Sequence, residues 1–216
     1  MSGNKVANLP MIQPFLTLDS VMDNLNISIE NNLFQHIQVK SSLIQGLIDV
    51  ETSNNDLIIV NNTFRDSTID SIYSISKLTN LRIFQNTAIN IKSSDLASSN
   101  SLVRVVDIGN VVIDDFSLRD SSFSSTINVG AMAFKSIKNL TLTSFSLHNL
   151  SSSTGSIFQI SSVETGLIQG MEASEIHSFP GTPLHTFFTF QAIDTVSHDF
   201  FEMSLESILL TDSSIP

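Results

Sequence analysis

The sequence contains no cysteine, no tryptophan and a single tyrosine. Without cysteine, the chain has no disulfide scaffold, no thiolate zinc site and no cysteine nucleophile. Basic residues are also scarce: 10 Lys and Arg stand against 21 Asp and Glu, for a formal net charge of −11. Such an acidic surface repels nucleic-acid phosphates and anionic lipids, so no nucleic-acid partner is expected. Because no run of about 18 apolar residues is present, no membrane insertion is expected either.

The residues that are abundant favour strands. Phe occurs 15 times, and hydrophobic residues make up 41% of the chain, whereas charged residues make up 14%. β-Branched and aromatic residues are typical of strands, and they alternate here with Ser, Thr and Asn. No segment carries an apolar stripe of helical period over several turns. The 216 residues are therefore predicted to form an all-β domain.

A unit of about 25 to 32 residues repeats along the chain. Each unit begins with an alternating strand, such as 102–105, and passes through a polar bend into a Leu-x-Ile strand. A third short strand, such as 116–118 or 201–203, ends the unit, and seven copies are visible. Such short strands cannot bury an apolar face alone, but units stacked about 4.8 Å apart share a core.

The polar bends contain a recurring amide or carboxylate. Its members in successive units are Asn24, Asp56, Asn80, Asn110 and Asn139. Asn and Asp tolerate left-handed backbone and bond to neighbouring polar groups, so we expect a ladder of side chains along the stack. Gly166 and Thr195 are expected to interrupt this ladder towards the C-terminus.

The three-strand unit with Asn before Leu-x-Ile resembles the right-handed parallel β-helix of the pectin-lyase-like superfamily. The repeat at 139–153 and 55–68 is similar in style to long repetitive, ciliate-like surface proteins of protists. The resemblance implies a right-handed parallel β-helix solenoid of about seven coils over 12–216, after a lead-in segment at 1–11. It leaves the activity open, because this superfamily includes lyases, hydrolases, adhesins and passive shafts.

One outer column of polar residues is the best candidate ligand-binding surface. Arg65-Asp66-Ser67 and Arg119-Asp120-Ser121 take matched positions two units apart. With the units between and after them, the expected stripe contains Arg65, Asp66, Asn90, Arg119, Asp120, His148 and Asn149. Guanidinium and carboxylate groups in a row suit sugar hydroxyls or uronates. The preferred interpretation is a set of surface ion pairs, each worth about 0 to 1 kcal/mol.

Other catalytic or metal-binding patterns are not found in the sequence. Asp114-Asp115 is the one adjacent acidic pair, and its counterparts in other units are not acidic. The paired-Asp, Gly-His-Gly and Arg-x-Lys elements of polygalacturonases are missing. The histidines lack metal-binding spacing and none is expected beside a Ser and an acid; they are His36, His148, His177, His185 and His198. No catalytic residue, metal or cofactor is therefore predicted.

Four sequons of the form N-x-Ser/Thr begin at Asn26, Asn61, Asn139 and Asn149. Asn61 and Asn149 are expected to be accessible, whereas a glycan on Asn139 is expected to disturb the ladder. Near the C-terminus, Ile208, Leu209 and Leu210 are expected to be exposed.

The expected function is a non-catalytic structural or adhesive module at an extracellular or cell-surface location. Its expected partners are other copies or neighbouring chains at the solenoid ends, with carbohydrate as a further candidate. The alternative is a carbohydrate-active enzyme, a polysaccharide lyase or glycosidase, that uses the Arg/Asp stripe. A third interpretation, the tip of a phage-like spike, predicts an obligate trimer.

Overall fold

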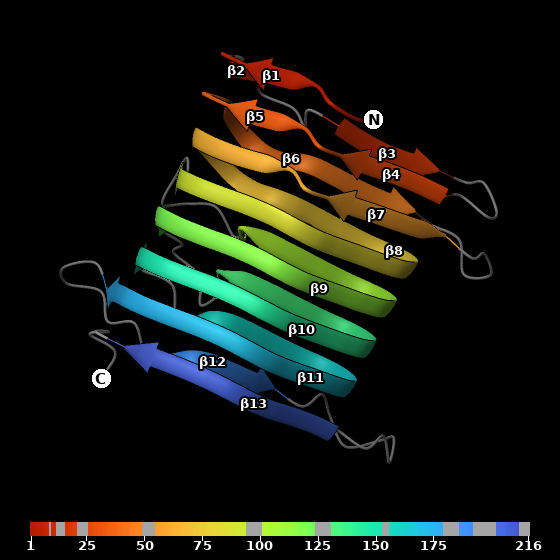
Figure 1. The fold of residues 1–216 in the computed structure, drawn as a ribbon. Helices are drawn as coiled ribbons and strands as arrows, with labels where there is room; N and C mark the ends of the chain where they lie inside the picture. Colours follow the sequence, from red (N-terminus) through yellow and green to blue (C-terminus); the bar gives the residue numbers. More distant parts are fainter. Residues whose placement is uncertain are drawn as a thin grey trace.

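The protein is described by a computed structural model that covers residues 1–8, 10–11, 16–20, 26–48, 55–93, 101–123, 131–152, 156–178, 186–191 and 202–211. Within these ranges there is no helix, and 13 strands join into one sheet that winds along the stack. Every pairing between these strands is parallel. The all-β parallel solenoid predicted from the repeat is confirmed (Figure 1).

Short strands lie at both ends of the stack and long strands lie in the middle. The N-terminal strands are β1 (Lys5–Ala7), β2 (Pro10–Met11), β3 (Leu16–Ser20), β4 (Asn26–Glu30), β5 (Leu33–Gln35), β6 (Gln38–Ile48) and β7 (Asp56–Val60). They are followed by β8 (Thr63–Lys92), β9 (Val103–Phe123), β10 (Met132–Ser152), β11 (Ser156–Ser178), β12 (Thr186–Gln191) and β13 (Glu202–Thr211). Figure 1 shows β8, β9, β10 and β11 following one another down the stack in sequence order.

The number of turns is smaller than the repeat count suggested. The long strands β8 to β11 form about four turns, whereas seven coils were expected. The shorter strands extend the stack at both ends: β1, β4 and β5 precede β8, and β12 and β13 follow β11. The expected lead-in segment contains β1 and β2, which pair with β5 and β6.

Three columns of residues with left-handed backbone divide each turn into three faces. In β9 these residues are Asp107, Asp115 and Asp120, with φ of 55°, 54° and 53°. Corner I contains Lys77, Asp107, Ser136 and Ser162; corner II contains Asn31, Asn61, Gln85, Asp115, Ser144, Gly170 and Ser207; corner III contains His36, Asp66, Asn90, Asp120, Asn149 and Glu175. The frequent Asn and Asp in the sequence fit this use, because their short polar side chains make left-handed backbone less costly.

The three faces are defined by their residue ranges in β9. Face A runs between corners I and II (108–114), and face B runs between corners II and III (116–119). Face C begins after corner III (121–123) and continues in the alternating strand of the next unit (132–135). Side chains alternate between the interior and the outer surface along each face, as strand geometry requires.

The interior is filled by aligned apolar side chains. On face A, Leu81 and Ile83 lie against Val111 and Ile113, and all four are 2% exposed or less. Aromatic rings also stack from coil to coil: the Phe34 and Phe64 rings are nearly parallel, with centroids 5.0 Å apart. Face C has the register expected for the alternating strands. The predicted apolar core is therefore confirmed.

The last coil differs from its predicted alignment. Residues 201–203 were assigned to a third strand, but Glu202 and Met203 pair with Thr165 and Gly166 on face A. The connection from Gln191 to Glu202 is longer than its counterpart in the preceding coil, which shifts the register. Thr195 and His198 lie outside the described residues.

β13 leaves part of its apolar surface uncovered. Leu209 and Leu210 are exposed, as expected, whereas Ile208 is half-buried. Leu210 pairs with buried Ala173, so its side chain belongs to an inward-facing column although it is 44% exposed. In the part of the chain that is described, no helix is long and apolar enough to cross a bilayer.

Candidate functional site

The predicted amide ladder runs along the start of face A. Asn110 Nδ2 donates to Asn80 Oδ1 at 2.7 Å, and Asn139 Nδ2 donates to Asn110 Oδ1 at 2.6 Å. At the N-terminal side, Asn80 Nδ2 donates to Asp56 Oδ1 at 2.6 Å. The ladder is therefore confirmed for these four residues, and each amide bonds to the coil before it.

Two members of this ladder were assigned wrongly from the sequence. Register places Asn26 opposite Asp56, whereas Asn24 lies outside the described residues. At the other end, Thr165 takes the ladder position and Gly166 is the next residue. Thr165 Oγ1 donates to Asn139 Oδ1 at 2.6 Å, so the expected interruption at this coil does not occur.

A second, buried amide ladder was missed from the sequence. Asn32, Asn62 and Asn86 follow corner II and are 2% exposed or less. Asn32 Nδ2 donates to Asn62 Oδ1 at 2.9 Å, and Asn62 Nδ2 donates to Asn86 Oδ1 at 3.1 Å. The signal was present as the pairs Asn31-Asn32 and Asn61-Asn62, in which the first residue makes the corner and the second points inward.

This buried ladder also binds backbone carbonyls. Asn62 Nδ2 donates to the carbonyl oxygens of Ile29 and Val60 at 2.9 and 3.0 Å. In the next coil the position is occupied by Phe116, which pairs with Asn86. The interior therefore changes from amide to aromatic packing part-way along the stack.

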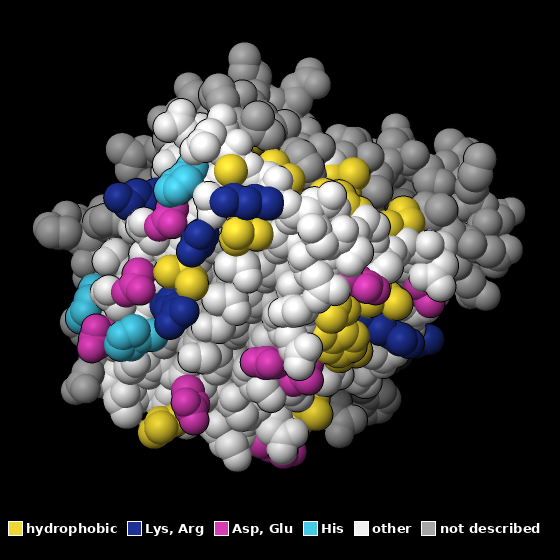
Figure 2. Space-filling view, turned by 45° about the horizontal axis from the view of Figure 1, so that its top comes forward, with side chains coloured by type: hydrophobic (Ala, Val, Ile, Leu, Met, Phe, Trp, Pro, Cys, Tyr) yellow, Lys and Arg dark blue, Asp and Glu magenta, His cyan; other side chains and the backbone are white. Residues whose placement is uncertain are grey.

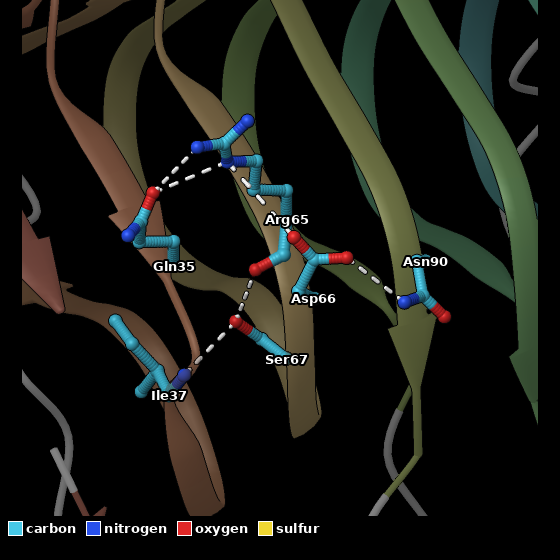
Figure 3. A network of polar contacts seen from close by, with 6 residues as sticks. All are labelled: Gln35, Ile37, Arg65, Asp66, Ser67 and Asn90. Atoms are coloured by element: carbon cyan, nitrogen blue, oxygen red, sulfur yellow. Dashed lines mark hydrogen bonds and ion pairs between the residues drawn. The ribbon is translucent and has the colours of Figure 1, made fainter. Parts of the chain in front are cut away.

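The expected Arg/Asp stripe is brought together at corner III and the adjoining column of face B (Figure 3). Gln35 Oε1 accepts hydrogen bonds from Arg65 Nε at 3.2 Å and from Nη2 at 2.7 Å. Asp66 Oδ1 accepts from Asn90 Nδ2 at 2.9 Å, and Asp66 Oδ2 lies 4.0 Å from Arg65 Nε. Gln35 belongs to this network but was not predicted.

The second half of the stripe repeats the carboxylate–amide contact. Asn149 Nδ2 donates to Asp120 Oδ1 at 2.8 Å. Arg119 is in register with Ile89 on one side and His148 on the other. Its guanidinium forms no hydrogen bond or ion pair with a described residue. In Figure 2, dark blue, magenta and cyan side chains follow one another along the left of the molecule.

The serines of the two Arg-Asp-Ser motifs bond to backbone groups of their own coil and of the neighbouring coil. Ser67 Oγ donates to the Arg65 carbonyl at 2.7 Å and accepts from the Ile37 N–H at 3.1 Å (Figure 3). Ser121 makes the same contacts with the Arg119 carbonyl and the Ile91 N–H, at 2.7 and 3.0 Å. Both serines are buried, so they link neighbouring coils instead of facing a ligand.

His148 lies between a serine and a glutamate, contrary to the sequence-based expectation. Its Nδ1 is 2.8 Å from Ser174 Oγ, and its Nε2 is 3.8 Å from Glu175 Oε2. The two partners belong to the next coil, so proximity in the sequence did not reveal them. A shallow hollow of about 230 Å³ adjoins this cluster, lined by Ser146, Leu147, His148, Glu172, Ala173, Ser174, Leu209 and Thr211.

The adjacent acidic pair is divided between two positions. Asp115 forms corner II, and the Asp114 carboxylate accepts a hydrogen bond from Thr143 Oγ1 at 2.7 Å. Asp114 is in register with Phe84 and Thr143, as the repeat predicted. Over the described ranges, no three His, Asp or Glu side chains gather at a spacing suited to a metal ion.

The four sequon asparagines, Asn26, Asn61, Asn139 and Asn149, are all exposed. Asn61 lies at corner II and Asn149 at corner III, whereas Asn26 and Asn139 lie on face A. Of the other histidines, His36 lies at corner III and His177 is half-buried. His185 lies outside the described residues.

Comparisons with protein-family models, with curated proteins and with solved structures find no match to this chain. The resemblance to the pectin-lyase-like superfamily therefore depends on the repeat unit and the parallel stack. Any functional argument has to come from the geometry of the polar columns.

Proposed function

We propose that this chain is a non-catalytic structural or adhesive module, a stiff β-solenoid in an extracellular surface, wall or filament assembly. One observation carries the proposal: three carboxylates of the outer polar columns are bonded to side chains of the next coil. Asp56, Asp66 and Asp120 each accept a hydrogen bond from an asparagine amide at 2.6 to 2.9 Å. Side chains used in this way hold coils together and are not held free for a substrate.

The continuity of the stack supports a mechanical role. The register between β9 and β10 is maintained from Val103–Met132 to Phe123–Ser152, through all three faces. Each coil is joined to the next by backbone hydrogen bonds, and the amide ladders add side-chain bonds along the same axis. A closely packed interior resists bending, because any tilt between coils opens gaps in the core.

The proposed partners are other copies or neighbouring chains that dock at the solenoid ends. Leu205 and Leu210 in β13 pair with Ile168 and Ala173, which are buried. Their own side chains are 48% and 44% exposed. Apolar groups of this kind are buried when a further coil covers them, which supports end-on contact as the mode of assembly.

The alternative is a polysaccharide lyase or glycosidase that uses the Arg/Asp stripe. One observation favours this alternative: the Arg119 guanidinium forms no hydrogen bond or ion pair with a described residue, and Arg119 is in register with His148. The unfavourable observation is the pair Asp66 and Asp120, which are two coils apart. Two rungs of about 4.8 Å separate them by about 9.6 Å, at the upper limit of the 5 to 9.5 Å used by glycosidase carboxyl pairs.

Two measurements on the purified chain separate these functions. Incubation with uronic-acid polysaccharides, with and without calcium, is expected to release no unsaturated or reducing ends. Turnover that disappears in Asp120→Ala or Arg119→Ala would replace the structural proposal with the enzymatic one. Electron microscopy and light scattering are expected to show end-to-end assemblies; an obligate trimer would instead support a spike tip.

A further inference from the structure

Exposure separates the sequon asparagines from the others in the middle of the stack. Between residues 55 and 152, the described asparagines outside a sequon are all buried or half-buried: Asn55, Asn62, Asn80, Asn86, Asn90 and Asn110. In the same span the sequon asparagines, Asn61, Asn139 and Asn149, are all exposed. Within this span the sequon coincides with the exposed asparagines, whereas nearer the N-terminus Asn4, Asn8 and Asn31 are exposed outside a sequon.

Asn61 and Asn149 have a further property in common, because both lie at single-residue corners. Their φ values are 51° and 49°, and both residues are exposed. Asn61 Nδ2 donates to Asn31 Oδ1 at 2.7 Å, and Asn149 Nδ2 donates to Asp120 Oδ1 at 2.8 Å. Each amide nitrogen carries two hydrogens, so one N–H remains for a new bond.

The hydroxyl residues of the Asn61 and Asn149 sequons are both partly exposed. Thr63 is the first residue of β8 and is half-buried, and Ser151 in β10 is half-buried as well. Asn139 is different: its Nδ2 donates to Asn110 and its Oδ1 accepts from Thr165. Its amide is held from both sides in the face A ladder, which makes Asn139 a natural comparison within the same chain.

We propose that Asn61 and Asn149 are acceptors of N-linked glycans. In this reaction the amide nitrogen bonds to the anomeric carbon of a lipid-linked oligosaccharide, the bond from that carbon to the diphosphate breaks, and one amide proton is lost to a base. The remaining N–H continues to donate to Asn31 or Asp120. The inference depends on the proposed extracellular location, because the donor is met in a secretory pathway.

The test uses the full chain secreted from eukaryotic cells behind a cleavable signal sequence, measured by intact mass before and after endoglycosidase. Thr63→Val and Ser151→Ala remove the sequon hydroxyl but keep both asparagines. Each variant is expected to lose the mass of one glycan, and the double variant to lose two. The proposal would be overturned if secreted wild-type protein lacked glycan on Asn61 or on Asn149, or carried glycan on Asn139 instead.

A created sequon provides the matched control. Val112→Thr completes the sequence Asn110-Val-Thr at an asparagine that is half-buried and bonded to Asn80 and Asn139. This variant is expected either to be secreted without an additional glycan or to be retained in the cell. If it is glycosylated, secreted and as heat-stable as the wild type, amide exposure does not select the acceptor and the proposal fails.

Failure of the glycan proposal can be distinguished from failure of the proposed function. Because the test cells secrete the chain behind an added signal sequence, the experiment tests the two acceptor sites independently of the native location. Glycan on Asn61 and Asn149 in secreted protein, together with glycan-free protein from the native source, would support the acceptor geometry and contradict the extracellular location. Loss of end-to-end assembly with both glycans in place would contradict only the structural function.

Discussion

Asn149 donates a hydrogen bond to Asp120 of the preceding coil, and both residues have left-handed backbone at corner III. The same relationship joins Asn90 to Asp66. Residues that make the sharp bends of the solenoid therefore also tie its coils together. At corner III, Asn and Asp therefore both adopt the left-handed backbone and form the side-chain hydrogen bonds between coils.

The buried amide ladder is expected to contribute more to stability than the exposed one. Asn62→Ala removes the side-chain donor to the Ile29 carbonyl and the acceptor of the Asn32 N–H and Nδ2, and a buried group left without a partner costs about 1–3 kcal/mol. Urea unfolding followed by circular dichroism should show this loss. Asn110→Ala is the control, and its effect is expected to be smaller because water reaches its partners, half-buried Asn80 and exposed Asn139.

The corner residues are expected to respond to substitution according to their backbone. Gln85 has φ of 52° at corner II and is exposed. Gln85→Val should lower the free energy of unfolding by about 1–2 kcal/mol, because a β-branched residue fits left-handed backbone poorly. Gln85→Gly should leave it equal or higher. Equal stability of the Val and Gly variants in thermal unfolding would contradict this role for φ.

Two glycines are expected to differ in their tolerance of alanine. A Cβ on Gly109 would lie 2.8 Å from the Thr79 carbonyl oxygen, a backbone atom of the neighbouring coil. Gly109→Ala should therefore destabilise the protein by about 1–3 kcal/mol, as overpacking does. A Cβ on Gly166 would meet the end of the flexible Met203 side chain, so Gly166→Ala should cost less. Chemical denaturation of both variants makes the comparison, and a larger loss for Gly166→Ala would refute it.

Tyr73 is expected to make the fold sensitive to alkaline pH. Its hydroxyl is buried and has no hydrogen-bond partner among the described residues, and burial raises the pKa of this phenol well above its usual value of 10.0. A raised pKa in the folded state means that stability is complete below about pH 10 and falls as the pH rises further, because the unfolded chain then releases the proton.

Tyr73→Phe tests this sensitivity. The variant should unfold at equal or higher denaturant concentration at neutral pH, because it removes an unpaired buried hydroxyl. It should also lose the alkaline decrease in stability. Since Tyr73 is the one tyrosine of the chain, tyrosinate absorbance reports its ionisation directly. Titration near pH 10 in the folded protein would show that the side chain is not buried.

The repeat in the sequence predicted more of the fold than of the site. The alternating strands, the Leu-x-Ile strands and the ladder at Asn80, Asn110 and Asn139 were all found from spacing. Period-2 alternation and turn-forming amides are local properties, so they can be seen in one coil at a time. The last coil was misaligned because the longer connection before Glu202 breaks the spacing on which that method depends.

The contacts of the candidate site came mainly from the tertiary structure. Gln35 meets Arg65, and Ser174 meets His148, across separations of 30 and 26 residues. No rule of spacing within a unit pairs these residue types, since the stacking register alone brings them together. The buried position of Asn62 beside exposed Asn61 likewise follows from which side of a corner each residue takes.

The amino-acid sequence by itself determined that this chain forms parallel coils with an apolar interior, because each unit has an apolar face that only another unit can cover. The tertiary structure decided how many turns form and which polar side chains meet, because those depend on connection lengths and on the register between coils. Side chains 24 to 30 residues apart become neighbours in this fold at the distance between adjacent strands.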